Sequence, residues 1–103
     1  MTAYFIASYR ITDSEGYELY VPSVIPTLQV HGCEVLAADY ASQAIEIAPN
    51  NVTVILKFTS KEAAMVWYDS PEYQAIKHLR TDNSEGTAVL VEQWSPPGQG
   101  ENQ

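Results

Sequence analysis

The sequence has few basic residues and no long apolar run, and both shortages exclude classes of partner. Five Lys and Arg residues stand against thirteen Asp and Glu residues, which gives a formal net charge of −8. Nucleic-acid backbones and anionic membrane surfaces attract clustered Lys and Arg, so we expect no nucleic-acid and no membrane partner. No apolar stretch approaches the roughly 20 residues that span a bilayer. The N-terminus shows no signal-peptide pattern. We therefore expect a soluble, cytoplasmic protein.

Signature motifs for metal and cofactor chemistry are also missing. The single cysteine, Cys33, allows neither an intrachain disulfide nor a CxxC pair, and we interpret it as a buried, inert thiol. His31 and His78 have no metal-ligand spacing, and we interpret His31 as a surface cap at a helix end. The sequence contains no glycine-rich phosphate loop and no Gly-x-Ser-x-Gly elbow. We therefore expect no metal site and no bound cofactor.

Among the residues that are present, the segment from Trp67 to Ile76 is the most informative. Ser70 is a good helix N-cap, and the Pro71 that follows suits a first helical position because proline has no backbone N–H. The sequence thus predicts a helical region that begins at Lys61, pauses at Ser70-Pro71 and resumes to about Arg80.

A second helical region is predicted between Thr12 and Gly32. Apolar residues recur there at helical spacing. Pro22 and Pro26 should break or kink it, because each proline removes a hydrogen bond and crowds the preceding turn. We expect two short helical pieces, with Gly32 as the stop signal.

Four segments are predicted to be strands. Apolar residues alternate within them, and turn signals such as Pro49-Asn50-Asn51 and the polar loop 81–86 separate the elements. The predicted strands are Tyr4–Ile11, Cys33–Ala41, Val52–Phe58 and Thr87–Trp94.

The element order is β-α-β-β-α-β. With right-handed crossovers this order predicts an α+β, ferredoxin-like domain over residues 1–94, a four-stranded antiparallel sheet with helices on one face. An unrelated α+β order is the alternative. Residues 95–103 are expected to form a flexible C-terminal tail. RNA-recognition modules share the topology, but this chain is acidic and lacks their aromatic strand pattern.

Both faces of the predicted sheet carry apolar residues. In the first strand Phe5 and Tyr9 oppose Tyr4 and Ile6, so neither face is clearly polar. An open apolar sheet face is unusual on a monomer. We therefore expect a homodimer in which two subunits cover each other's sheets.

At these residues the chain resembles the domain-of-unknown-function family 1330, part of the dimeric α/β-barrel superfamily. The resemblance covers roughly Ala3 to Glu92 and implies a ferredoxin-like fold and a barrel-like homodimer. It brings no established reaction. Related superfamily members include cofactor-independent monooxygenases and muconolactone isomerases, which makes an enzyme plausible by analogy. The matching residues are Asp13, Glu15, Tyr17, Tyr20, Gly32, Phe58, Ser60, Glu62, Ala63, the run Trp67-Tyr68-x-Ser70-Pro71-Glu72-Tyr73, and Arg80.

Four residues are candidates for catalysis: Asp39 as base, His78 as proton shuttle, Arg80 as anion clamp and Tyr68 as phenol donor. Each has a structural alternative. His78 and Arg80 could stabilise a helix C-terminus. Asp39 could face water at a sheet edge or pair with Arg10.

Two functions remain open from the sequence. The first is a cofactor-free, monooxygenase- or isomerase-like enzyme that acts on a small organic molecule in a cleft between sheet and helices. The second is a non-catalytic dimeric module that binds a small molecule or serves in stress. Six large aromatics could line such a cleft or fill the core: Tyr9, Tyr20, Tyr40, Tyr68, Tyr73 and Trp67.

Overall fold

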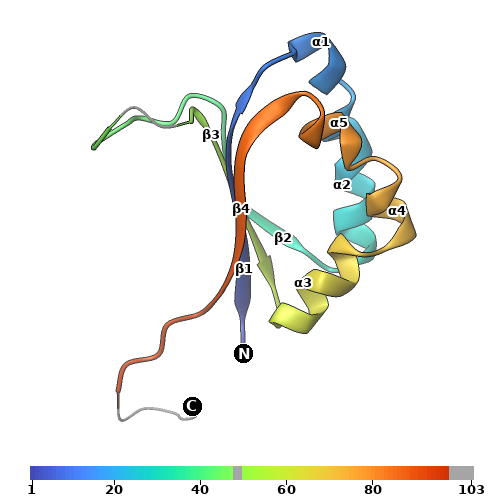
Figure 1. Cartoon of the computed structure of the whole chain (residues 1–103). Helices are drawn as coiled ribbons and strands as arrows, with labels where there is room; N and C mark the ends of the chain where they lie inside the picture. The colour runs from blue at the N-terminus through green and yellow to red at the C-terminus, as the bar shows by residue number, and fades with distance from the viewer. Residues whose placement is uncertain (48–49, 98–103) are drawn as a thin grey trace.

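The chain folds into a four-stranded antiparallel sheet with all helices on one face (Figure 1). The computed structural model describes residues 1–47 and 50–97. The sheet order is β2-β3-β1-β4, and every neighbouring pair is antiparallel, which confirms the predicted ferredoxin-like α+β fold. The elements are β1 (Ala3–Ile11), α1 (Ser14–Tyr17), α2 (Tyr20–Val30), β2 (Glu34–Asp39), β3 (Val52–Phe58), α3 (Lys61–Tyr68), α4 (Pro71–Gln74), α5 (His78–Thr81) and β4 (Ser84–Glu92).

The fourth strand begins earlier than predicted. We expected a polar loop over 81–86 and a strand over Thr87–Trp94, but β4 runs from Ser84 to Glu92. Its first residues pair with the end of β1, where Arg10 lies opposite Glu85 and forms an ion pair with it. Cross-strand pairing therefore draws polar residues into the sheet. Arg10 is thus not the partner of Asp39.

The first helical region has the two predicted pieces, but the prediction of where they separate was wrong. The chain breaks between Tyr17 and Tyr20 rather than at a proline. Pro22 lies in the first turn of α2, where no intrahelical bond from its nitrogen is needed. Pro26 lies inside α2, which continues to Val30. Gly32 follows with a φ of 66°, a conformation that suits glycine, and ends the region as predicted.

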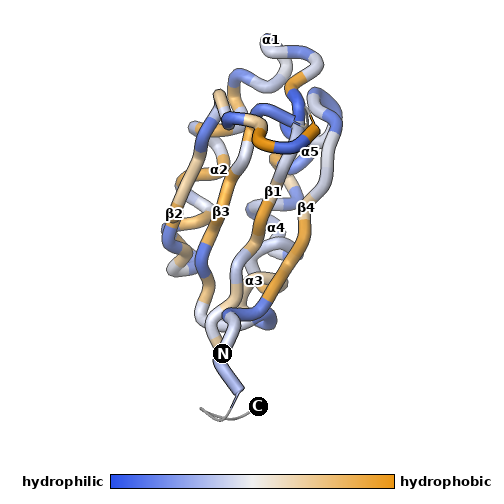
Figure 2. The backbone as a smooth tube through the Cα atoms, turned by 90° about the vertical axis from the view of Figure 1, so that its left-hand side faces the viewer, coloured by the Kyte–Doolittle hydropathy of each residue, from blue (hydrophilic) through white to orange (hydrophobic). Residues whose placement is uncertain are grey.

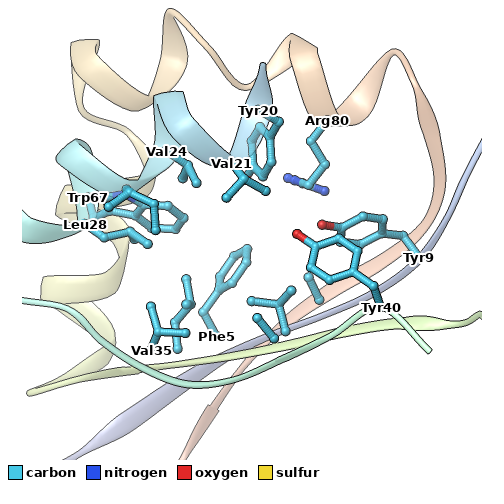
Figure 3. Close-up of a pocket in the computed structure, with 15 residues that line it drawn as sticks. Phe5, Tyr9, Tyr20, Val21, Val24, Leu28, Val35, Tyr40, Trp67 and Arg80 are labelled. Carbon is cyan, nitrogen blue, oxygen red and sulfur yellow. The ribbon is translucent and has the colours of Figure 1, made fainter. Parts of the chain in front are cut away.

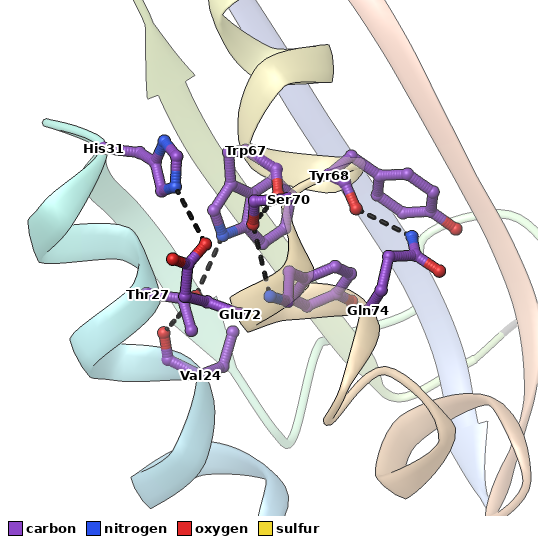
Figure 4. Close-up of polar contacts among 9 residues, drawn as sticks. Val24, Thr27, His31, Trp67, Tyr68, Ser70, Glu72 and Gln74 are labelled. Carbon is purple, nitrogen blue, oxygen red and sulfur yellow. Dashed lines mark hydrogen bonds and ion pairs between the residues drawn. The ribbon is translucent and has the colours of Figure 1, made fainter.

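The predicted break at Ser70-Pro71 is confirmed and lies at the centre of the core. The Ser70 hydroxyl donates to the Trp67 carbonyl at 2.7 Å and accepts from the Tyr73 N–H at 3.2 Å (Figure 4). Trp67 and Tyr73 are both 0% exposed, and their ring centroids lie 4.2 Å apart. The Trp67 indole N–H donates to the Thr27 hydroxyl at 3.0 Å. This bond links α3 to α2.

Helix α4 ends sooner than expected. The prediction extended one helix to about Arg80, whereas α4 stops at Gln74 and a separate short helix, α5, carries His78 and Arg80. Residues 75–77 form turns between them. This second break turns Arg80 toward the sheet, where its side chain is buried.

The sheet has one covered and one open face. Along β1, Phe5, Ala7 and Tyr9 are buried under the helices. On the other face, Ile6 lies between Ile55 of β3 and Val89 of β4. Figure 2 looks onto this open face and shows apolar stretches running along the strands. The apolar second face predicted from the sequence is therefore present.

The last described residues follow the sheet. Residues 95–97 follow β4 in no helix or strand, and the rest of the predicted tail, 98–103, lies outside the described residues. Within residues 1–47 and 50–97, no helix is long and apolar enough to cross a membrane.

We expect Ser70→Ala to destabilise the protein by about 1–2 kcal/mol, because the Tyr73 N–H at the start of α4 loses its cap. Urea unfolding followed by tryptophan fluorescence measures the change. Ser14→Ala is the control, since Ser14 is exposed and has no side-chain hydrogen bond in the described part of the chain. Equal stability of the two variants would contradict the role given to Ser70.

Candidate functional site: an apolar cavity with one buried cation

A cavity lies between α2 and the covered face of the sheet (Figure 3). The cavity has a volume of about 70 Å³ and is partly open to solvent. Strands contribute apolar side chains to one wall and α2 contributes them to the other. We call Tyr9, Tyr20, Tyr40 and Arg80 its polar end. The remaining lining residues are Phe5, Ala7, Val21, Val24, Ile25, Leu28, Val35, Ala38, Val54, Leu56 and Trp67.

A chain of phenol hydroxyls runs through the polar end. The Tyr9 and Tyr17 hydroxyls lie 2.5 Å apart, and the Tyr17 hydroxyl lies 3.1 Å from that of Tyr40. Tyr9 and Tyr17 are buried, whereas Tyr40 is 41% exposed. Hydroxyl groups both donate and accept, so such a chain can relay hydrogen bonds from the cavity to solvent.

Among the described residues that line the cavity, Arg80 is the one that carries a charge. It is 8% exposed, and its Nε and Nη2 donate to the Tyr73 hydroxyl at 3.3 and 3.2 Å. Its guanidinium carbon lies 5.9 Å from the centre of the Tyr9 ring, a cation–π contact. No carboxylate of the described residues lies within ion-pair distance of it. A buried cation without a counter-ion is costly and often marks a ligand site.

Burial raises the pKa of three phenols at this site above the ordinary value. Desolvation raises the pKa of Tyr9 to about 12, against the opposing hydrogen bond from Tyr17. Desolvation also raises the pKa of Tyr17 and of Tyr20 above the ordinary value. For Arg80, burial opposes the charge, but the oxygens of Tyr73 and Tyr20 raise the pKa overall. At neutral pH the site therefore holds a cation and neutral hydrogen-bond donors.

Of the four predicted catalytic residues, the structure brings only Arg80 to the cavity. Asp39 is exposed, and its carboxylate accepts a hydrogen bond from the Ala41 N–H at 2.8 Å. This matches the alternative in which Asp39 faces water. His78 is exposed on α5. Tyr68 is half-buried, and its ring lies 5.2 Å below the Lys77 ammonium. In the part of the chain that the structure describes, no carboxylate and no imidazole lines the cavity.

Four of the six aromatics proposed as cleft residues line the cavity, namely Tyr9, Tyr20, Tyr40 and Trp67. Tyr73 supports Arg80 from behind, and Tyr68 lines a separate hollow beside Met65 and Leu90. The sequence interpretation missed Tyr17 as a site residue. Tyr17 lies three residues before Tyr20, a spacing that places two helical side chains on the same face. This spacing could have identified Tyr17 from the sequence.

The remaining chemically reactive side chains lie apart from the cavity. Burial raises the pKa of the Cys33 thiol to about 11, so little thiolate exists at neutral pH, which supports an inert thiol. His31 Nε2 lies 3.8 Å from Glu72 Oε1, joining the end of α2 to the start of α4. Within residues 1–47 and 50–97, no three His, Cys, Asp or Glu side chains are grouped to hold a metal ion.

The fold and this site define a ferredoxin-like α+β protein with an apolar cavity beneath its helices. The chain belongs to the family described as domain of unknown function 1330 (DUF1330), whose model matches residues 2–94. The resemblance noted in the sequence is thereby confirmed. No curated protein is significantly similar in sequence to this chain.

Solved structures share this fold at low sequence identity. A protein of unknown function from Rhodopseudomonas palustris aligns with a TM-score of 0.73 and 12% identity, over 92% of this chain and 84% of that one. SnoaB, a cofactor-independent oxygenase from Streptomyces nogalater, aligns with a TM-score of 0.58 and 10% identity, over 95% and 98% of the two chains. A dimeric protein of unknown function and ferredoxin-like fold from Bacteroides fragilis aligns with a TM-score of 0.57 and 12% identity, over 89% and 96%. At such identities the likeness shows the fold alone.

Stability should fall steeply above pH 10. The buried Tyr9, Tyr17 and Tyr20 have raised pKa values, so the unfolded state loses phenol protons first and binds fewer protons than the folded state. Their contribution is complete below pH 10, the unfolded value, and is lost as the pH rises toward the folded values. Each phenol adds a slope of about 1.4 kcal/mol per pH unit. Urea unfolding at pH 9 to 11.5 tests this, and Tyr9→Phe should reduce the slope. A flat profile would contradict the buried network.

Proposed function

We propose that this protein binds a small, largely apolar organic molecule in the cavity between α2 and the sheet. The observation that carries the proposal is the combination of an apolar lining with one buried cation at its end. Binding sites for small molecules commonly pair apolar walls with a few placed polar groups. In this arrangement Arg80 clamps a negatively charged or polar group of the ligand, and the apolar walls hold its body.

The functional unit of this proposal is a homodimer that pairs the open faces of two sheets. Tyr4, Ile6, Ile55 and Val91 form an apolar band on that face, with Val89 50% exposed. The Arg10–Glu85 and Lys57–Glu34 ion pairs flank the band. An apolar centre with a polar rim is typical of a subunit interface. The Bacteroides fragilis protein of similar fold is described as dimeric, which supports a dimer but not a particular interface.

A cofactor-free enzyme acting on the same ligand is the second candidate. It is supported by the likeness in fold to SnoaB and by the hydroxyl chain from Tyr9 to the exposed Tyr40. The base and shuttle roles of Asp39 and His78 stay predictions, since neither residue lines the cavity. Chemistry in the cavity would instead depend on Arg80 and the phenols. Single-turnover assays with bound ligand would separate catalysis from binding.

Blocking the cavity mouth should abolish ligand binding. Val21 lines the mouth and is 38% exposed, so we expect Val21→Trp to weaken binding of 4-nitroanisole and indole at least roughly tenfold, as the added ring occupies the ligand's place. Ligand-observed NMR measures the affinity. Val30→Trp is the matched control, because Val30 is on the same helix but 74% exposed and outside the cavity. Unchanged binding by both variants, or no binding to the wild type, would reject the site.

A charge on the open face should separate the dimer. We expect Ile6→Lys to lower the apparent mass from about twice to about once the 11.4 kDa chain mass, because a buried lysine without a partner destabilises the interface. Sedimentation velocity on dilute protein measures the mass. Val66→Lys on α3 is the control, since Val66 is 61% exposed on the helical side. A monomeric wild type would remove the basis of the dimer.

A further inference from the structure

Hydrogen-bond donors exceed acceptors at the polar end of the cavity. Arg80 carries five N–H groups and no acceptor. Two of these groups, on Nε and Nη2, are used on the Tyr73 hydroxyl. The guanidinium also hydrogen-bonds the Tyr20 side chain, and its other N–H groups have no carboxylate partner among the described residues. In Figure 3 the guanidinium reaches from α5 into the cavity near Tyr20 and above Tyr9.

The phenols add to the excess of donors. The Tyr73 oxygen already accepts two N–H groups from Arg80, which fill its two lone pairs. Its own proton must therefore be donated to the Tyr20 oxygen, 2.8 Å away. The proton of Tyr20 is then left over, since no acceptor for it is found among the described residues.

The second group of phenols gives the same result. Tyr9, Tyr17 and Tyr40 have three hydroxyl protons but share only two hydrogen bonds. One proton is left over, on Tyr9 or Tyr40 at an end of the chain or on Tyr17 where Tyr17 accepts from both neighbours, and Tyr9 and Tyr40 line the cavity. Among the described residues, no carboxylate lines the cavity to accept it.

We propose that the polar end binds a single oxyanion, the phenolate or enolate oxygen of a flat organic molecule whose body lies between the apolar walls. This inference rests on the proposed small-molecule function and specifies the ligand. An oxyanion supplies the missing negative charge and accepts several donors at once, which a neutral ether or hydrocarbon does not. Phe5 and Trp67 provide aromatic surface for a flat body.

A carboxylate fits this site less well than a single oxygen. Arginine binds carboxylates best through two parallel N–H groups. The side-on Nε–Nη2 edge of Arg80 is occupied by the Tyr73 hydroxyl, which leaves only the end-on Nη1–Nη2 edge for such a pair. The donors that remain come from different residues, Arg80 and the phenols. Donors that converge from separate side chains suit one shared oxygen atom.

Three matched probes test the proposal on the full-length protein: 4-nitrophenol, which ionises near neutral pH, 4-nitroanisole, which cannot ionise, and 4-nitrobenzoate, which carries a carboxylate. We expect 4-nitrophenolate to bind roughly tenfold or more tightly than 4-nitroanisole. Binding should also lower the apparent pKa of 4-nitrophenol by about one unit for each tenfold preference. Absorption of the phenolate across pH 5 to 9 measures both quantities.

Variants identify the residues responsible. Arg80→Met should remove the preference for the phenolate while 4-nitroanisole still binds, and Tyr20→Phe should reduce the preference. Lys77→Met is the control, because it also removes one positive charge but lies over Tyr68, outside the cavity. If Arg80→Met does not fold, the Tyr20→Phe variant and the pH dependence of binding by the wild type still test the oxyanion site.

Each outcome has one meaning. Preference for 4-nitrophenolate that depends on Arg80 supports the oxyanion site. Equal binding of 4-nitroanisole overturns it and leaves the proposed small-molecule function intact. Tighter binding of 4-nitrobenzoate overturns the choice of a single oxygen. If none of the three probes binds, both the oxyanion site and the proposed function are rejected.

Discussion

The tilted packing of the Trp67 and Tyr73 rings is the interaction on which the rest of the structure depends. Ser70 and Pro71 break the helix between these two aromatics, and the break lets both rings enter the core, with their centroids 4.2 Å apart. The Phe5 ring of β1 packs against the indole in a T-shaped arrangement, with the ring centroids 5.3 Å apart. This contact joins the helical layer to the sheet. Such ring pairs contribute beyond the area that they bury. The helix break therefore places both aromatic rings in the core as well as turning the chain.

The same pair of rings determines where the positive charge of Arg80 lies. Tyr73 faces the indole with its ring and holds Arg80 with its hydroxyl. The guanidinium donates to the Tyr73 hydroxyl rather than to a carboxylate, so it remains a buried cation without a counter-ion among the described residues. The chain as a whole has a net charge of −8. Thirteen acidic residues are available in the sequence, yet the ion pairs of the described residues all lie elsewhere. The positive charge is thus directed into the cavity.

The two faces of the sheet differ in what they contact. The covered face supplies the floor of the cavity, and the open face presents an apolar band that a second subunit can cover. Alternation along β1 is the cause, because successive side chains point to opposite faces. Phe5 and Ala7 line the cavity, while Ile6 between them belongs to the open face. One strand therefore contributes to the proposed ligand site on one face and to the proposed dimer interface on the other.

Local patterns in the sequence determined the element order, the ferredoxin-like topology and the helix break at Ser70-Pro71. Alternation, capping residues and proline positions are short-range signals, and these features depend on them directly. Pro26 misled the prediction of the first break because packing of α2 against the sheet outweighs the loss of one helical hydrogen bond. The first residues of β4 were missed for a related reason, since their pairing with β1 joins residues about 75 positions apart. Only the tertiary structure decided the site. The sequence could name Arg80 beside Asp39 and His78, but burial and hydrogen-bond partners come from residues distant in the chain, and these separate Arg80 from the other two.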